Sequence, residues 1–224
     1  MSSPFAGSHA ASYADGPPRQ VPGFASLHLM TGMLLGERTP ADGRVLVHGA
    51  GGGLELKALA DQHPGWSFDG VDPSADMLRT AQTIIGDHAG RIRLHEGYID
   101  AAPDGPFHAA TSILTFHFIP REQRGETLRQ IRRRLKPGAP FVLAHISFPQ
   151  TEPQRSQAVA RHVAFAAGGV YDAARAASFA QAIGPKLTIL SPDEEEAMLR
   201  ENGFGDVTLF YAGLSFRGWV AYAV

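Results

Sequence analysis

The sequence contains no cysteine among its 224 residues. This absence excludes disulfide bonds, thiolate metal sites and cysteine nucleophiles, and we assign no metal site. No apolar run approaches the ~20 residues that a membrane-spanning helix needs, and the N-terminus lacks the charged-then-apolar pattern of a signal peptide. A formal net charge of -2 provides no basic surface for a tight grip on nucleic acid. We therefore expect a cytoplasmic protein that binds neither membranes nor nucleic acid.

The composition is that of a globular protein. Hydrophobic residues make up 44% of the chain and charged residues 19%. Residues 1–20 are rich in Ser, Gly, Ala and Pro and have no periodicity, so we expect a flexible tail there. Residues 21–224 contain no internal repeat and are expected to form a single domain.

Short apolar stretches and helical stretches alternate along most of the chain, which is typical of a parallel α/β sheet. After the fifth strand this alternation breaks. Residues 150–190 are Ala-rich and predict a helical cover over one end of the sheet. The predicted strands are 45–47, 66–71, 91–95, 108–116, 140–146, 204–210 and 215–222, the last two joined by a tight turn.

A glycine-rich turn stands at the centre of this pattern. The apolar run Val45–Val47 is followed by Gly49, Gly51 and Gly53, and a helix rich in Leu and Ala begins directly after them. Backbone N–H groups at such a helix start favour a nucleotide-like ligand. A tight chain reversal is the alternative explanation, because glycine tolerates a positive φ at no steric cost.

Asp72 ends the second predicted strand, 19 positions after Gly53. A carboxylate at this place is able to accept hydrogen bonds from both ribose hydroxyls of a nucleoside. It also suits the start of the helix that Ser74 can cap, and both roles are compatible. Leu54 stands where a dinucleotide fingerprint has its third glycine. This departure and the C-terminal hairpin favour S-adenosylmethionine (SAM) over a dinucleotide.

Three segments resemble successive motifs of the class I SAM-dependent methyltransferases: 45–53, 70–78 and 128–140. The resemblance implies a Rossmann-like fold with a seven-stranded, mostly parallel sheet, an antiparallel C-terminal hairpin and a helical cover. It also implies SAM as cofactor, S-adenosylhomocysteine (SAH) as product and a small molecule as methyl acceptor. None of the motifs identifies that acceptor.

The resemblance further implies residues of the cofactor site. Gly49, Ala50 and Gly51, in the turn that ends at Gly53, would pass beside the methionine part, and Asp72 would hold the ribose. Other residues would flank the adenine, line the floor near the sulfonium or close the pocket. These are Pro73, Met77, Tyr98 and Ile99 at the adenine, Ile113, Leu114 and Thr115 at the floor, and Phe24 at the mouth.

One position departs from the superfamily pattern. Methyltransferases of this class usually carry an acid two places before the first glycine, where it binds the amino group of the cofactor. Here that position is Val47. Binding of the methionine tail must then use backbone carbonyls, water or another side chain, and Glu55 is the acid nearest to the glycine turn in the sequence.

A narrower likeness joins the chain to the carboxy-SAM synthases, a dimeric branch, which makes a homodimer plausible. Residues 19–38 and 209–218 are similar to that family's N-terminal segment and C-terminal region. Three of its pocket residues differ, however. Phe24 replaces a tyrosine, Ile113 replaces an asparagine, and between Arg175 and Arg200 the chain has Lys186 but no arginine. We therefore interpret this likeness as one of architecture and not of activity.

Methyl transfer from a sulfonium needs in-line positioning, and a base where the nucleophile carries a proton. His117 after the fourth strand and Tyr171 in the cover are the predicted catalytic residues, although simple packing explains either of them equally well. The leading hypothesis is a small-molecule methyltransferase. The alternatives are an enzyme that modifies SAM itself, a non-catalytic SAM-binding module and, more distantly, a dinucleotide oxidoreductase.

Overall fold

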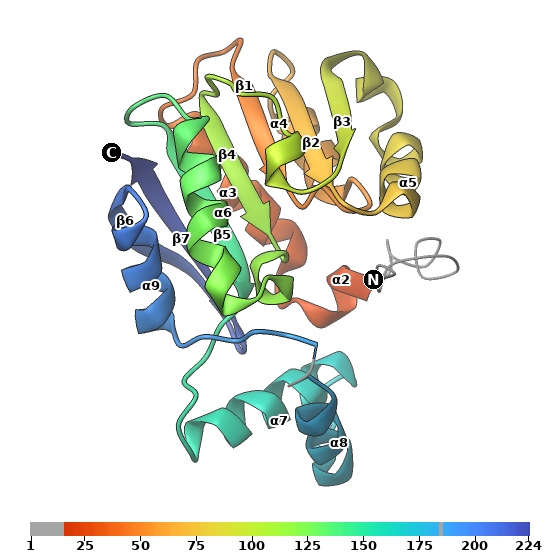
Figure 1. The fold of residues 1–224 in the computed structure, drawn as a ribbon. Coiled ribbons are helices and arrows are strands. Elements are labelled where there is room, and N and C mark those ends of the chain that lie inside the picture. Colours follow the sequence, from red (N-terminus) through yellow and green to blue (C-terminus); the bar gives the residue numbers. More distant parts are fainter. Residues whose placement is uncertain (1–15, 184–185) are drawn as a thin grey trace.

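The structure, a computed structural model, describes residues 16–183 and 186–224. A seven-stranded sheet with the order β3-β2-β1-β4-β5-β7-β6 forms its centre (Figure 1). The first five strands in this order are parallel, and β7 lies antiparallel between β5 and β6. The predicted mostly parallel sheet with an antiparallel C-terminal hairpin is thereby confirmed. The strands are β1 Arg44–His48, β2 Ser67–Asp72, β3 Ile92–Glu96, β4 Ala109–Ile113, β5 Pro140–Ile146, β6 Phe204–Gly213 and β7 Phe216–Ala223.

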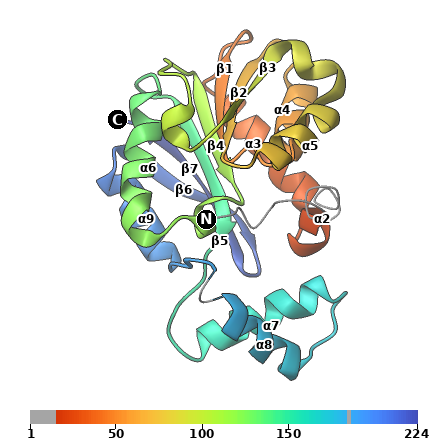
Figure 2. The same ribbon diagram turned by 45° about the vertical axis from the view of Figure 1, so that its right-hand side comes forward.

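Helices cover both faces of the sheet (Figure 2). The apolar side chains of three helices share one core with Val45 and Val47 of β1. Those of two further helices share the opposite core with Leu46. The first group is α3 Phe24–Gly36, α4 Leu54–Gln62 and α5 Ala75–Ile85, and the second is α6 Arg121–Arg133 and α9 Pro192–Glu201. Short 3-10 turns connect some elements: η2 Gly86–Arg91, η3 Ile99–Ala101 and η4 Phe116–Phe118.

The fourth strand is shorter than its apolar run predicts. β4 ends at Ile113, and Leu114 turns the chain with a φ of 58°. Phe116, in the following turn η4, is fully buried. Apolar residues therefore continue past the end of the strand because the turn itself is packed into the core, and hydrophobicity alone does not mark where the strand stops.

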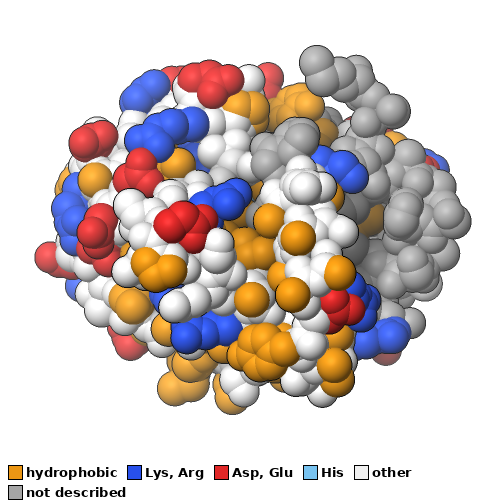
Figure 3. All heavy atoms as spheres, turned by 90° about the horizontal axis from the view of Figure 1, so that it is seen from below, with side chains coloured by type: hydrophobic (Ala, Val, Ile, Leu, Met, Phe, Trp, Pro, Cys, Tyr) orange, Lys and Arg blue, Asp and Glu red, His pale blue; other side chains and the backbone are white. Residues whose placement is uncertain are grey.

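The predicted cover contains two helices, α7 Gln154–Ala166 and α8 Ala173–Ile183, which pack against each other beyond one end of the sheet (Figure 1). Seen from that end, hydrophobic side chains gather among charged ones (Figure 3). Tyr171, in the loop between the two helices, is 72% exposed. Of the predicted tail, residues 1–15 lie outside the described residues, and Gly16–Gln20 forms the short helix α2. Within the described part of the chain, every helix is too short or too polar to cross a membrane.

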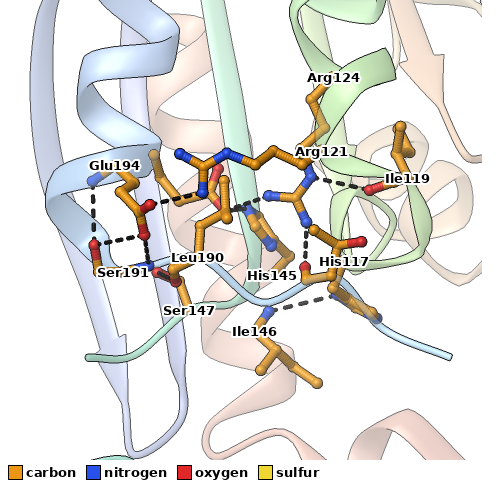
Figure 4. Close-up of polar contacts among 12 residues, drawn as sticks. His117, Ile119, Arg121, Arg124, His145, Ile146, Ser147, Leu190, Ser191 and Glu194 are labelled. Carbon is orange, nitrogen blue, oxygen red and sulfur yellow. Dashed lines mark hydrogen bonds and ion pairs between the residues drawn. The ribbon is translucent and has the colours of Figure 1, made fainter. Parts of the chain in front are cut away.

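A buried arginine fastens the segment that returns from the cover to the sheet (Figure 4). Arg124 of α6 is fully buried and forms an ion pair with Glu195 of α9. Its guanidinium also donates to the carbonyl of Thr188, in the returning segment, and to that of Ile119 at 3.1 Å. α9 itself begins with the capping box of Ser191 and Glu194. The cover is thus tied to the sheet through one buried charge network.

Candidate functional site

The glycine turn follows the carboxyl end of β1 and packs closely against Thr115 and Ala81. Gly49, Gly51 and Gly53 have φ values of 76°, 50° and 86°. A Cβ on Gly49 would lie 2.0 Å from Oγ1 of Thr115, and one on Gly53 would lie 2.9 Å from Cα of Ala81. Both positions need glycine for its backbone conformation and for space. The turn is thus a cradle whose backbone a ligand can approach closely.

Asp72 connects this turn to the end of β2. Its Oδ2 accepts a hydrogen bond from the backbone N–H of Gly51 at 2.9 Å, and its Oδ1 accepts one from that of Ser74, also at 2.9 Å. Burial raises the pKa of Asp72, and these two N–H groups offset part of that effect. Each oxygen keeps a further lone pair, so the carboxylate remains able to accept from ribose hydroxyls. Ser74 caps α5 through its hydroxyl, as predicted.

A small hollow lies between the glycine turn, α3, α4 and the end of β4. Five of the predicted cofactor residues line it together: Phe24, Gly49, Ala50, Ile113 and Leu114. The free space is about 20 Å³, roughly the room for one water molecule. A methionine chain therefore enters only when side chains at the mouth move. Phe24 is partly exposed, and its ring contacts that of the buried His28 edge-on, with centroids 4.4 Å apart.

The other predicted adenine and floor residues lie along the same edge of the sheet. Met77 and Ile99 are buried, whereas Tyr98 is 73% exposed. Pro73 follows Asp72 directly, and Thr115 donates a hydrogen bond to the Ile113 carbonyl at 3.1 Å. The cofactor contacts assigned to these residues stay predictions.

Three residues of the hollow were not among the predicted cofactor contacts: His28, Leu54 and Glu55. His28 lies one helical turn after Phe24, so the spacing placed both on one face of α3. Glu55 is only 6% exposed, and its Oε1 has no hydrogen-bond partner among the described residues. A buried, unpaired carboxyl beside the cradle is a feature that fits an ammonium-bearing ligand. The residues present therefore fit a cofactor with an amino-acid tail.

The two predicted catalytic residues lie outside this hollow. His117 is 5% exposed, and its Nδ1 accepts a hydrogen bond of 3.5 Å from the backbone N–H of Ile146 (Figure 4). Burial lowers the pKa of His117 well below its usual value. His145 is fully buried, with Nε2 3.4 Å from Oε1 of Glu195. Tyr171 stands on the surface of the cover. The catalytic roles of His117 and Tyr171 stay predictions.

A larger hollow of about 530 Å³ lies between α2, α7 and α8. Its walls are mostly small or apolar, and His162, Arg175 and Ser178 add polar groups. Nδ1 of His162 lies 2.7 Å from the Ser215 hydroxyl of the terminal hairpin. A single histidine in an Ala-rich helix belongs to no motif, so no sequence signal selects it. Its spacing from Ala158 and Val159 nevertheless placed it on the buried face of α7.

The chain resembles known proteins in both sequence and fold. Residues 45–138 match the family described as methyltransferase domain. The carboxy-S-adenosyl-L-methionine synthase of Chromohalobacter salexigens is 26% identical over 216 residues, which is 95% of this chain and 80% of that protein.

Solved structures with the same fold include a putative O-methyltransferase from Nostoc punctiforme, with a TM-score of 0.66, 18% identity and coverage of 95% of this chain and 58% of that one. Human N-acetylserotonin methyltransferase in complex with SAM gives a TM-score of 0.61 at 15% identity, with coverage of 99% and 60%. The chain thus spans about three fifths of the length of these two proteins.

Proposed function

Because the chain belongs to the class I SAM-dependent methyltransferases, enzymes whose cofactor is SAM, we propose that it methylates a small molecule bound under its helical cover. The observation that carries this proposal is the shared edge of the sheet. There the glycine cradle, the Asp72 carboxylate and the end of β4 meet around one hollow. Bound SAM supplies an electrophilic methyl group, so the protein's task is to orient the two reactants and exclude water.

Each part of the edge has a task in this proposal. The backbone of Gly49 to Gly51 supports the methionine chain, and Asp72 accepts hydrogen bonds from the ribose hydroxyls. Met77 and Ile99, both buried, bound the adenine. Ile113 and Leu114 form the floor, where their apolar side chains keep water away from the reacting centre.

We place the acceptor in the hollow between α2, α7 and α8. Its apolar walls and the Arg175 guanidinium favour a molecule with an apolar body and an anionic group. Ser178→Trp places an indole ring at the wall of this hollow and is expected to impair methyl transfer while leaving SAH affinity unchanged. A Ser178→Trp enzyme that methylates its acceptor at the normal rate would exclude this location.

Calorimetric titration with SAH tests the cofactor site. We expect saturable binding to the wild-type protein and a loss of about tenfold or more in Asp72→Ala, because the ribose loses a charge-assisted partner. Asp104→Ala removes a carboxylate whose side chain is 86% exposed and should bind like the wild type. The site is refuted if SAH fails to bind, or if Asp72→Ala and wild type bind equally. Turnover of SAM with a panel of metabolites then tests the transfer itself, and binding without any turnover supports a non-catalytic module.

A second candidate is a reaction on SAM itself, favoured by the likeness to carboxy-SAM synthases over almost the whole chain. The absence of an arginine between Arg175 and Arg200, where the chain has only the exposed Lys186, argues against it. Mass spectrometry of the cofactor that co-purifies with the protein separates the two, because a carboxylated cofactor carries added mass. The homodimer implied by the same likeness stays a prediction that sedimentation velocity tests.

A further inference from the structure

We propose that Glu55, on the first turn of α4, binds the ammonium group of the methionine part of SAM and replaces the acid that position 47 lacks. This role for Glu55 rests on the proposed SAM site and explains how the chain binds the ammonium group although position 47 is a valine. It follows from where the Glu55 carboxyl lies, from its lack of a partner and from its charge state.

The position of Glu55 matches the missing acid in space although not in sequence. Val47 of β1 and Thr111 of β4 are paired in the parallel register, so their side chains point to the same face of the sheet. Val47 belongs to the core on the α3 and α4 side. The Glu55 carboxyl descends onto this face from α4 and lies beside the Thr111 hydroxyl. It therefore reaches the sheet position over which an acid at residue 47 would stand.

The carboxyl opens onto the cradle and has no cation of its own. Glu55 lines the hollow together with Gly49 and Ala50. Neither its Oε1 nor the Thr111 Oγ1 forms a hydrogen bond of regular geometry within the described residues. Leaving a buried polar group unpaired destabilises a fold, so such a group beside the glycine cradle points to a ligand that pairs with it.

No neighbouring charge of the described chain neutralises Glu55. From α3, His28 lines the same hollow, but burial lowers the pKa of its ring and keeps it neutral. At the turn, Asp72 is itself an acid, and its two oxygens accept hydrogen bonds from backbone N–H groups. On α4 itself, Lys57 pairs with Asp61 on the exposed side of the helix.

These surroundings set the protonation state of Glu55. Burial raises the pKa of its carboxyl to about 8, with the Thr111 hydroxyl offsetting part of the effect. At pH 7 the carboxyl is therefore mostly protonated. An ammonium placed beside it favours the ionised form. Binding then converts the carboxylic acid and the ammonium into a carboxylate–ammonium pair and releases one proton to the solvent.

Calorimetry in two buffers of different ionisation enthalpy measures this proton. At pH 7 we expect SAH to release close to one proton per site. We expect 5′-methylthioadenosine, which has the nucleoside and thioether but lacks the amino acid part, to release almost none. Both measurements use the wild-type protein and do not depend on the folding of any variant. Binding of SAH without proton release overturns the role of Glu55, whereas failure to bind either ligand overturns the SAM site as a whole.

The variant Glu55→Gln supplies an independent comparison. It should lose about 10- to 100-fold in SAH affinity, because a charge-assisted contact is lost, and stay within about twofold for methylthioadenosine. The double variant Val47→Asp/Glu55→Gln should regain affinity for SAH. Equal losses for both ligands, or a double variant no better than Glu55→Gln, would mean that Glu55 serves only the packing of α4.

Discussion

Glu55 links the cofactor site to the pH dependence of folding. Burial raises the pKa of Glu55 to about 8, so the folded protein keeps this proton up to about that pH, whereas the unfolded chain loses it near the ordinary pKa of a glutamate, 4.5. Between these values the unfolded state binds fewer protons, so the free energy of unfolding falls as pH rises. Burial of Glu55 thus makes the ligand-free protein less stable toward pH 8, where the carboxyl becomes able to ionise and pair with an ammonium group.

Glu55→Gln should therefore remove this pH dependence. Relative to wild type, we expect the variant to gain stability by on the order of 1 kcal/mol per pH unit between pH 5 and pH 8. Urea unfolding at several pH values measures the difference, in which the contributions of the buried histidines cancel. Glu122→Gln, on the exposed first turn of α6, is the matched control and should run parallel to wild type. A parallel curve for Glu55→Gln as well would show that this acid is solvated.

Some residues of the site were predictable from the sequence and others were not. The motifs brought Phe24, Gly49, Ala50, Ile113 and Leu114 to one hollow, because each is fixed by its place at a strand end or helix start. They also exposed the missing acid at position 47. The depth of Glu55 was not predictable, since it depends on how closely α4 packs on β1 and β4. Nor did the sequence reveal that His117 is enclosed by the returning segment.

At the scale of elements, the glycine turn makes a sharp comparison possible. Gly49 and Gly138 have nearly equal φ values of 76° and 74°. A Cβ at Gly49 would overlap the Thr115 side chain, whereas a Cβ at Gly138 meets nothing within 4 Å. We expect Gly138→Ala to cost about 1 kcal/mol from backbone strain alone. Gly49→Ala should cost more, by about 1–3 kcal/mol, and should weaken SAH binding. Equal unfolding free energies for the two variants would contradict the close contact with Thr115.

The ion pairs between α6 and α9 provide a second comparison. Arg124 and Glu195 are fully buried, whereas Arg121 and Glu194 pair at the surface. Removing one partner of a buried pair leaves an uncompensated charge, so Arg124→Met should destabilise by about 3–5 kcal/mol. Arg121→Met should cost at most about 1 kcal/mol. Chemical unfolding of both variants measures the difference, and similar small losses would show that Arg124 does not hold the returning segment.

Elements differ in how well the sequence predicts them. β5 spans the predicted residues, and Ser191 caps α9 as its motif indicates. β4 was predicted too long because its buried turn is also apolar. The burial of Arg124 was predictable in principle, because Arg124 lies on the same helix face as Leu128 and Ile131. Its charge nevertheless suggests a solvated position until α9 is seen to cover it.

At the scale of the whole molecule, the mostly parallel sheet with its antiparallel hairpin was predicted from the sequence, whereas the contacts of the cover were not. Alternating strands and helices dictate a parallel sheet, and the terminal hairpin adds its antiparallel strands. The cover helix α7 contacts the short helix α2, which is far from it in sequence. That contact encloses the hollow assigned to the acceptor. It depends on long-range packing of small residues, which carry no positional signal in the sequence.

A crystal structure of the protein with SAH tests the cofactor site most directly. We expect the ribose on the Asp72 carboxylate, the adenine beside Met77 and Ile99, and the amino group within hydrogen-bond distance of Glu55, with Phe24 and His28 displaced from the mouth. Density for SAH at another place, or an amino group held away from Glu55 on the glycine turn, would contradict the proposed arrangement.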